Sequence, residues 1–130
     1  MPSSVRMLAV AVMLSALFLS GCASGKWNRY ELYMGQTYQD GQKQVSAQKW
    51  QDFLNLEVSP KFGDGYTVYD AKGYWAGEKL TYSERSKVLM IVSPDKDAEK
   101  RVDEIAKAYK KMFQQEAVLK VVNPVEVEFK

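Results

Sequence analysis

The polar run Glu84-Arg85-Ser86-Lys87 holds the residue types of this chain that could do acid–base or nucleophilic chemistry. In an extended strand, alternate side chains point to opposite faces, so Glu84 and Ser86 share one face and Arg85 and Lys87 the other. Glu84 is the candidate catalytic residue, as a carboxylate base in a buried position. Ser86 and Lys87 point apart, so they cannot act as a nucleophile–base pair. A polar strand end that pairs across a sheet is the alternative interpretation.

Aromatic residues near this run could form the walls of a binding pocket. The chain has eight tyrosines and three tryptophans, and such residues otherwise belong to a core or a dimer face. Asp64 lies between two glycines, where it could orient a ligand or make an Asx-turn. The candidate binding residues are Asp64, Tyr66, Trp75, Tyr82, Glu84, Ser86 and Lys87.

Composition disfavours several kinds of chemistry. The chain has no histidine and one cysteine, so it lacks the usual zinc and copper ligands and the commonest general base at neutral pH. It has no glycine-rich phosphate loop, and its net charge of +2 gives no nucleic-acid footprint. We therefore expect no metal, no cofactor and no nucleic-acid partner, and these absences favour binding over catalysis.

The first 22 residues differ in composition from the rest of the chain. One base, Arg6, precedes an apolar run from Met7 to Leu19, a pattern typical of an export signal and too short to span a membrane as a helix. The next residues, Leu19-Ser20-Gly21-Cys22, resemble the lipobox of bacterial lipoproteins. An ordinary cleaved signal with an incidental cysteine is the alternative.

This resemblance implies how the protein is processed and where it resides. Residues 1–21 would be removed as a signal peptide, Cys22 would carry the lipid, and residues 22–28 would form a short leash to a domain at residues 29–130. Two or three acyl chains, palmitate among them, suffice for stable membrane anchoring. Ala23 in place of an aspartate implies an outer-membrane lipoprotein facing the periplasm, if the cell is Gram-negative.

Periodicity and capping residues predict six elements in the order strand, helix, strand, strand, helix, strand. Ser46 is a helix N-cap, Val45 and Trp50 form a hydrophobic staple, and Pro60 ends that helix. Asp95 or Asp97 caps the second helix, which has helical pairs Asp97–Arg101 and Asp103–Lys107. The strands are expected at residues 30–38, 66–70 (followed by a turn or bulge at 71–73), 82–93, and 118–122 continued by 125–129 after Pro124.

This order predicts an α+β fold, a ferredoxin-like β-α-β-β-α-β sandwich whose four-stranded antiparallel sheet has both helices on one face. The other face would be left open and rich in tyrosine. Residues expected on it are Tyr33 or its neighbours and several of Tyr66, Tyr69 and Tyr82. Apolar patches of this size are rarely left bare, so we expect a homodimer joined through the open sheet faces.

Several motifs in this order are similar to the DUF3574 family of short bacterial proteins, many of them secreted or lipidated. They are Pro60 to Val68, Gly73-Tyr74-Trp75, the run from Glu84 to Lys87, and Tyr109 through Val118. Gly63 stands where the family often has a second proline, which implies a looser loop. The resemblance implies no reaction. Our leading hypothesis is a lipid-anchored, non-enzymatic binding or interaction domain; the alternative is a small enzyme of the dimeric α/β-barrel kind that uses Glu84 and tyrosines.

Overall fold

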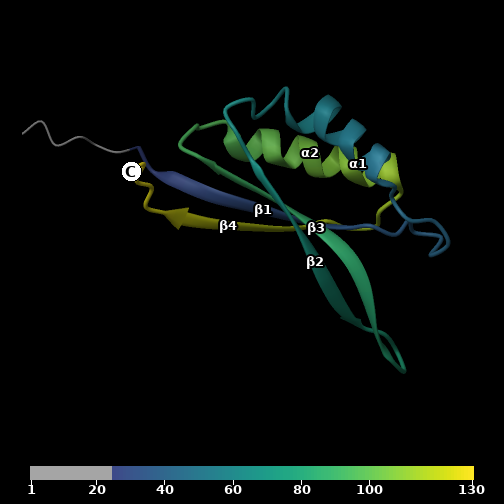
Figure 1. Ribbon diagram of the computed structural model, residues 1–130. Helices are drawn as coiled ribbons and strands as arrows, with labels where there is room; N and C mark the ends of the chain where they lie inside the picture. Colours follow the sequence, from purple (N-terminus) through teal and green to yellow (C-terminus); the bar gives the residue numbers. More distant parts are fainter. Residues whose placement is uncertain (1–24) are drawn as a thin grey trace, which may run out of the picture.

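One layer of the molecule is a four-stranded antiparallel sheet in the order β2-β3-β1-β4, and the other is a pair of helices (Figure 1). The computed structural model describes residues 25–130; the predicted signal segment and Cys22 lie outside the described residues. The strands are β1 (Trp27–Gly35), β2 (Thr67–Ala76), β3 (Thr81–Ser93) and β4 (Leu119–Val125); the helices are α1 (Ala47–Phe53), continued by the π-helical turn η1 (Leu54–Val58), and α2 (Ala98–Phe113).

This order of elements and strands confirms the predicted ferredoxin-like α+β sandwich. Both helices cover the same face of the sheet because the right-handed connections of two β-α-β halves return the chain to one side. No helix among residues 25–130 is long and apolar enough to cross a membrane.

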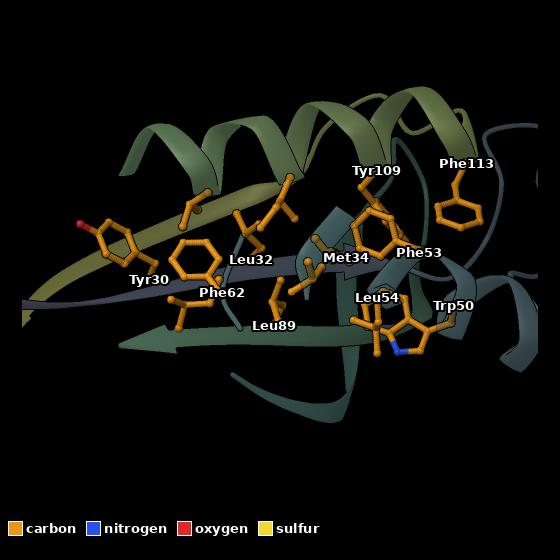
Figure 2. Packing of buried hydrophobic residues seen from close by; sticks show 14 of the residues in the cluster. Tyr30, Leu32, Met34, Trp50, Phe53, Leu54, Phe62, Leu89, Tyr109 and Phe113 are labelled. Carbon is orange, nitrogen blue, oxygen red and sulfur yellow. The ribbon is translucent and has the colours of Figure 1, made fainter. Parts of the chain in front are cut away.

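The core lies between the helices and one face of the sheet (Figure 2). Alternate residues of β1, Tyr30, Leu32 and Met34, point into it, and β3 adds Leu89 and Ile91. The helices contribute a mainly aromatic set at steps of three and four: Trp50, Phe53, Val102, Ile105, Tyr109 and Phe113. The ring centroids of Tyr109 and Phe53 are 5.1 Å apart, with planes at 71°, an edge-to-face contact that joins the two helices.

The first helix begins and ends as its sequence predicts. Ser46 is the N-cap, and its hydroxyl oxygen accepts a hydrogen bond from the backbone N–H of Lys49 at 3.1 Å. Val45 and Trp50 are both buried, as the predicted staple requires. The helical turns end at Ser59, directly before Pro60.

The predicted turn at Ala71-Lys72-Gly73 is wrong, because β2 continues through these residues as far as Ala76. Every residue from Thr67 to Ala76 pairs with β3 in an unbroken register. The chain turns only after Ala76, where the Gly77 N–H donates to the Leu80 carbonyl at 2.9 Å. Pairing with β3 over ten consecutive residues outweighs the local turn preference of Gly73.

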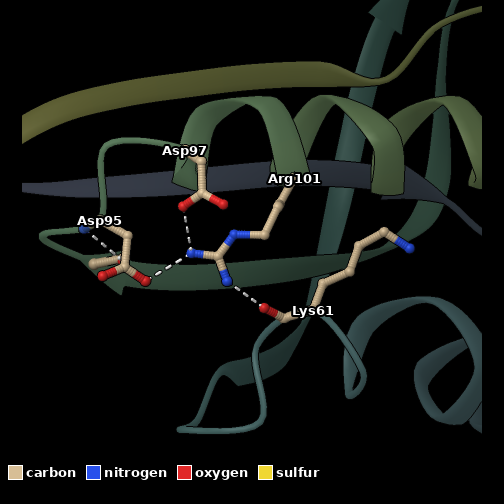
Figure 3. Close-up of polar contacts among 5 residues, drawn as sticks. Lys61, Asp95, Asp97 and Arg101 are labelled. Carbon is tan, nitrogen blue, oxygen red and sulfur yellow. Dashed lines mark hydrogen bonds and ion pairs between the residues drawn. The ribbon is translucent and has the colours of Figure 1, made fainter.

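The start of α2 is tied down by an arginine instead of a side-chain cap (Figure 3). Asp97 occupies the N-cap position but makes no capping hydrogen bond. Its carboxylate and that of Asp95 bind Arg101 Nη2 at 3.1 and 2.6 Å. The predicted Asp97–Arg101 pair is therefore confirmed. Arg101 also donates to the carbonyl of Lys61, so it links α2 to the loop that follows η1.

Two further expectations about the second half of the chain need correction. Asp103 pairs with Lys120 of β4 at 2.6 Å instead of with Lys107, because β4 brings that lysine beside α2. The predicted break at Pro124 is absent: β4 runs from Leu119 to Val125, and residues 126–130 form no strand. Pro124 is tolerated because β4 is an edge strand, as predicted. The first strand covers residues 27–35 instead of 30–38.

Replacing Trp50 by alanine is expected to lower the free energy of unfolding by about 3–5 kcal/mol, as large aromatic truncations in cores do. Trp50 is 6% exposed and packs against Phe53 and Tyr109. Replacing the exposed neighbour Lys49 by alanine should change stability by less than about 0.5 kcal/mol. Urea denaturation checks both, and similar midpoints for the two variants would show that the indole contributes little to the core.

Candidate functional site

The face of the sheet that the helices leave uncovered, the open face, carries a row of aromatic and aliphatic side chains. The register places Tyr33 of β1 and Tyr69 of β2 on either side of Val88 of β3, and Leu119 of β4 beside Tyr33. Val88 is fully buried although no helix covers it, which agrees with its position between two tyrosines. Tyr33, Tyr69 and Tyr82 therefore lie on the open face as predicted.

The hairpin of β2 and β3 extends beyond the other two strands. The last residue of β1, Gly35, pairs with Ser86, and the pairs from Lys72–Arg85 to Ala76–Thr81 lie past that point. We call residues 72–85 the arm; Figure 1 shows it projecting away from the body of the domain. An open corner results where the arm leaves the body.

A hollow of about 580 Å³ occupies this corner on the open face. Two glycines sit beside its polar residues: Gly35 is opposite Ser86 in the register, and Gly73 is opposite Glu84. A Cβ atom at Gly35 would lie 2.6 Å from Glu84 Oε1, so no larger residue fits there while the carboxylate keeps its place. A Cβ atom at Gly73 would lie 3.2 Å from the indole nitrogen of Trp75. Because these two glycines have no Cβ atom, the side chains of Glu84 and Trp75 can occupy the space beside them.

Two charged residues, Glu84 and Lys72, line the hollow, and Glu84 is the acidic one. Its side chain is half-buried, and Oε1 accepts a hydrogen bond from the backbone N–H of Thr37 at 3.1 Å. The Thr37 carbonyl in turn accepts a hydrogen bond from the Gln115 side chain. Among residues 25–130, no lysine or arginine forms an ion pair with Glu84. The hollow therefore contains a positioned carboxylate that forms no ion pair within this part of the chain, although Lys72 also belongs to the lining.

A buried network fixes Gly35 from the helix side. The Tyr109 hydroxyl donates to the Gly35 carbonyl at 2.6 Å and accepts a hydrogen bond from the Gln36 side chain at 2.9 Å. Gln36 also donates to the Met34 carbonyl at 3.2 Å. Burial, and to a lesser extent the nearby Glu84 carboxylate, raises the pKa of Tyr109 far above its ordinary value. Tyr109 is thus a permanent neutral donor at neutral pH.

The lining of the hollow defines what it can accommodate. Glu84 and the buried Ser86 provide acceptor oxygens, while Tyr33, Trp75 and Leu119 provide apolar surface. A carboxylate beside aromatic faces suits a positively charged or hydrogen-bond-donating group attached to a flat apolar body. Within the described part of the chain, no cluster of three or more carboxylate or cysteine groups is placed to hold a metal ion.

The structure brings three of the predicted site residues together and places the others elsewhere. Trp75, Glu84 and Ser86 line the hollow. Tyr82 is opposite Trp75 on the same face of the arm, next to the hollow but outside its lining. Lys87 points to the helix face, where it pairs with Asp70 and lies 5.9 Å from the centroid of the Trp50 indole.

Asp64 and Tyr66 lie at the other end of the molecule. The Tyr66 hydroxyl is 2.8 Å from Ser59 Oγ and its ring packs against the core, so the expectation that Tyr66 could join the open face is wrong. Both residues line a second cavity of about 880 Å³, whose other walls include Trp27 and Phe129. The turn at Asp64 is closed by the backbone, with the Gly65 N–H donating to the Phe62 carbonyl at 3.2 Å.

Sequence reasoning missed several residues of the hollow. Gly35 and Gly73 contribute its space, and Leu119 adds an apolar wall. A glycine inside a strand is a recognised sign of close approach by another group, so Gly35 and Gly73 carried a usable signal. Gln115 lies in the polar end of the second helix, a segment that could line a cleft but that we expected to face solvent; it reaches Thr37 across 78 positions of the chain.

A family model described as "Protein of unknown function (DUF3574)" matches residues 29–129, and the chain belongs to this family. Among curated proteins, no sequence matches. The arrangement of elements is similar to that of solved structures of low sequence identity. A phage SAM lyase in complex with S-methyl-5′-thioadenosine is 15% identical, with a TM-score of 0.59 over 77% of this chain and 81% of that one.

Two CutA proteins have the same arrangement. The periplasmic divalent cation tolerance protein CutA from Archaeoglobus fulgidus is 12% identical, with a TM-score of 0.54 over 80% of this chain and 88% of that one. CutA1 from Oryza sativa is 8% identical, with a TM-score of 0.54 over 80% and 84%. At these identities the likeness establishes the ferredoxin-like fold alone, since one fold hosts many unrelated functions.

Replacing Tyr109 by phenylalanine is expected to lower the free energy of unfolding by about 1–3 kcal/mol at pH 7, because the Gly35 carbonyl and the Gln36 amide each lose a buried partner. The difference from the unmodified protein should shrink above about pH 10. There the unfolded chain ionises its tyrosine while the folded protein, whose Tyr109 pKa is raised, keeps the proton. Denaturant unfolding at pH 7 and pH 11 measures both effects; a difference that stays constant would contradict the role given to burial.

Proposed function

We propose that this member of the DUF3574 family is a lipid-anchored, non-enzymatic binding domain of the cell envelope, which takes a small organic cation with a flat apolar body. The observation that carries the proposal is the Glu84 carboxylate. It is held by the Thr37 N–H at 3.1 Å beside Gly35 and forms no ion pair with any residue of 25–130, including Lys72, which also lines the hollow. A half-buried carboxylate without a partner is costly, so a cationic ligand would restore the missing interaction.

Aromatic side chains beside Glu84 support a ligand that is both charged and flat. Trp75 and Tyr33 line the same hollow as the carboxylate, and the indole is the aromatic ring that attracts cations most strongly. Such contacts are worth about 0.5–2 kcal/mol. The volume of about 580 Å³ is within the range of small-molecule sites, roughly 300–1,000 Å³.

The rigid surroundings of the hollow favour binding over catalysis. The Gly35 carbonyl accepts a hydrogen bond from the Tyr109 hydroxyl on the helix side. The Thr37 backbone donates to Glu84 and accepts from the Gln115 side chain. Among the described residues that line it, Ser86 is the aliphatic hydroxyl and has only Glu84 as a neighbouring acid–base group on its face of β3. Pre-organised acceptor groups recognise a ligand without any chemical step.

The phage SAM lyase of similar fold supplies a useful second probe. Its structure contains S-methyl-5′-thioadenosine, a neutral ring with sugar hydroxyls. A cation and a neutral nucleoside test different properties of the hollow: the first depends on the charge of Glu84, whereas the second depends mainly on stacking and hydrogen bonding. Conversion of this nucleoside by the protein would favour the alternative, an enzyme that uses Glu84.

Replacing Glu84 by glutamine is expected to weaken binding of phenyltrimethylammonium at least tenfold, because the isosteric amide keeps the shape of the side chain and removes its charge. Isothermal titration calorimetry on the full chain measures the dissociation constants. Glu78→Gln, at the exposed tip of the hairpin, is the matched control and should bind like the unmodified protein. Equal binding by the Glu84 and Glu78 variants, or tighter binding of S-methyl-5′-thioadenosine that ignores both changes, would argue against a cation site.

The lipid anchor is a separate part of the proposal and rests on the Leu19-Ser20-Gly21-Cys22 motif. Replacing Cys22 by alanine removes the thiol that would be acylated, so the protein should remain uncleaved or become soluble. Membrane fractionation and mass spectrometry of the N-terminus check this, with the unmodified protein as the reference. A variant that is still processed normally and still sediments with membranes would refute the anchor.

A further inference from the structure

The arm carries more apolar surface than an isolated two-stranded ribbon supports. Trp75 is 48% exposed and Tyr82 is 60% exposed on the open-face side of the arm, and Leu80 at its tip is 79% exposed. A single hairpin is at best marginally stable in water. Past Gly35, no strand of residues 25–130 pairs with either edge of this ribbon, although the Gln36 N–H still donates to the Arg85 carbonyl at 2.9 Å. The arm therefore requires a second surface to rest on.

The open face continues this apolar surface onto the body of the domain. Tyr69 of β2 is 41% exposed and Leu119 of β4 is 53% exposed, and both lie on the same face as Trp75 and Tyr82. A sheet face that is exposed to solvent on a monomeric protein is usually polar.

The charges on the open face are compatible with contact between identical copies. Arg29 and Glu31 point to this face and pair with each other at 3.6 Å, and Glu84 lies inside the hollow. Identical surfaces that meet across a twofold axis bring like charges together unless each copy neutralises its own. The helix layer differs, since its surface carries the charged network of Asp95, Asp97 and Arg101.

We propose that two copies of this chain pack open face to open face about a twofold axis, with both arms inside the interface. Four strands about 4.8 Å apart and about 30 Å long cover about 570 Å² in projection, and side chains standing on them expose more. A stable interface takes about 800 Å² from each partner, so the open face with its arm has the required size. Face-to-face packing of sheets, about 10 Å apart, is a standard way to bury such surfaces.

This arrangement places the mouth of the Glu84 hollow against the second copy, so a ligand bound there would be enclosed between the two sheets. The hollow and the arm are a recess and a projection on one face, which is the self-complementary shape that a twofold contact needs. The contact deepens the proposed binding function but does not depend on the ligand. Ligand-free protein therefore tests the two ideas separately.

The test compares two tyrosines of the same arm that point to opposite faces. The Tyr82 side chain lies on the open face. By strand alternation the Tyr74 side chain, which is 66% exposed, points to the other side of the ribbon, although Tyr74 also belongs to the lining of the hollow. The full chain in detergent, at micromolar concentration and without ligand, should have twice the protomer mass by light scattering with detergent subtracted. Tyr82→Lys should reduce the mass to that of one protomer, and Tyr74→Lys should leave it doubled.

A second variant keeps the test valid if a lysine at Tyr82 disturbs the arm itself. Leu119→Lys changes the open face on β4, away from the arm, and should also give the single mass, while circular dichroism shows that each variant is folded. A single mass for the unmodified chain would overturn the proposal, as would equal effects of the Tyr74 and Tyr82 changes or an assembly of more than two copies. Calorimetry with phenyltrimethylammonium on the unmodified chain and on Tyr82→Lys, which lies outside the lining of the hollow, reports the binding function independently.

Discussion

The contact of α2 with the end of β1 through Tyr109 is the interaction on which the rest of this structure depends. The ring centroid lies 5.1 Å from that of Phe53 and 6.0 Å from that of Trp50, both on α1, so Tyr109 joins the two helices to each other. Its hydroxyl reaches through the core to the Gly35 carbonyl at 2.6 Å. A single buried side chain thus holds the helix layer, the end of β1 and the floor of the hollow in one unit. Because the hydroxyl stays protonated well above neutral pH, this unit does not change across physiological conditions.

A mismatch in strand length creates the candidate site. β3 has 13 residues and β1 has nine, so the β2–β3 hairpin continues after β1 has ended at Gly35. Just past Gly35, the side chains of the hairpin have the body of the domain on one side and open space on the other. Glu84 fills part of the space, and its hydrogen bond from the Thr37 N–H replaces the strand pairing that β3 loses there. The same geometry that leaves the arm without neighbours also gives the domain a concave, acidic corner.

The two layers of the domain differ in electrostatic character. The helix layer is covered with paired charges such as Lys120 with Glu99 and Asp103, which suit contact with water. The open face is aromatic and aliphatic, with its own charges paired or recessed. Proteins of similar fold as different as a phage SAM lyase and CutA show that this architecture accommodates unrelated roles. The proposed function therefore rests on the residues of the hollow and not on the fold.

The sequence by itself determined the order of the elements, the fold class, the cap at Ser46, the staple of Val45 and Trp50, and the presence of tyrosines on the open face, because these follow from periodicity and local hydrogen bonding. It also singled out Glu84, Ser86 and Trp75. Only the tertiary structure decided that β2 runs through Gly73, that Lys87 and Tyr66 face the helix side, and that Gly35, Thr37 and Gln115 surround Glu84. Strand register and strand length are set by pairing between segments far apart in the chain, and no local pattern records where a partner strand ends.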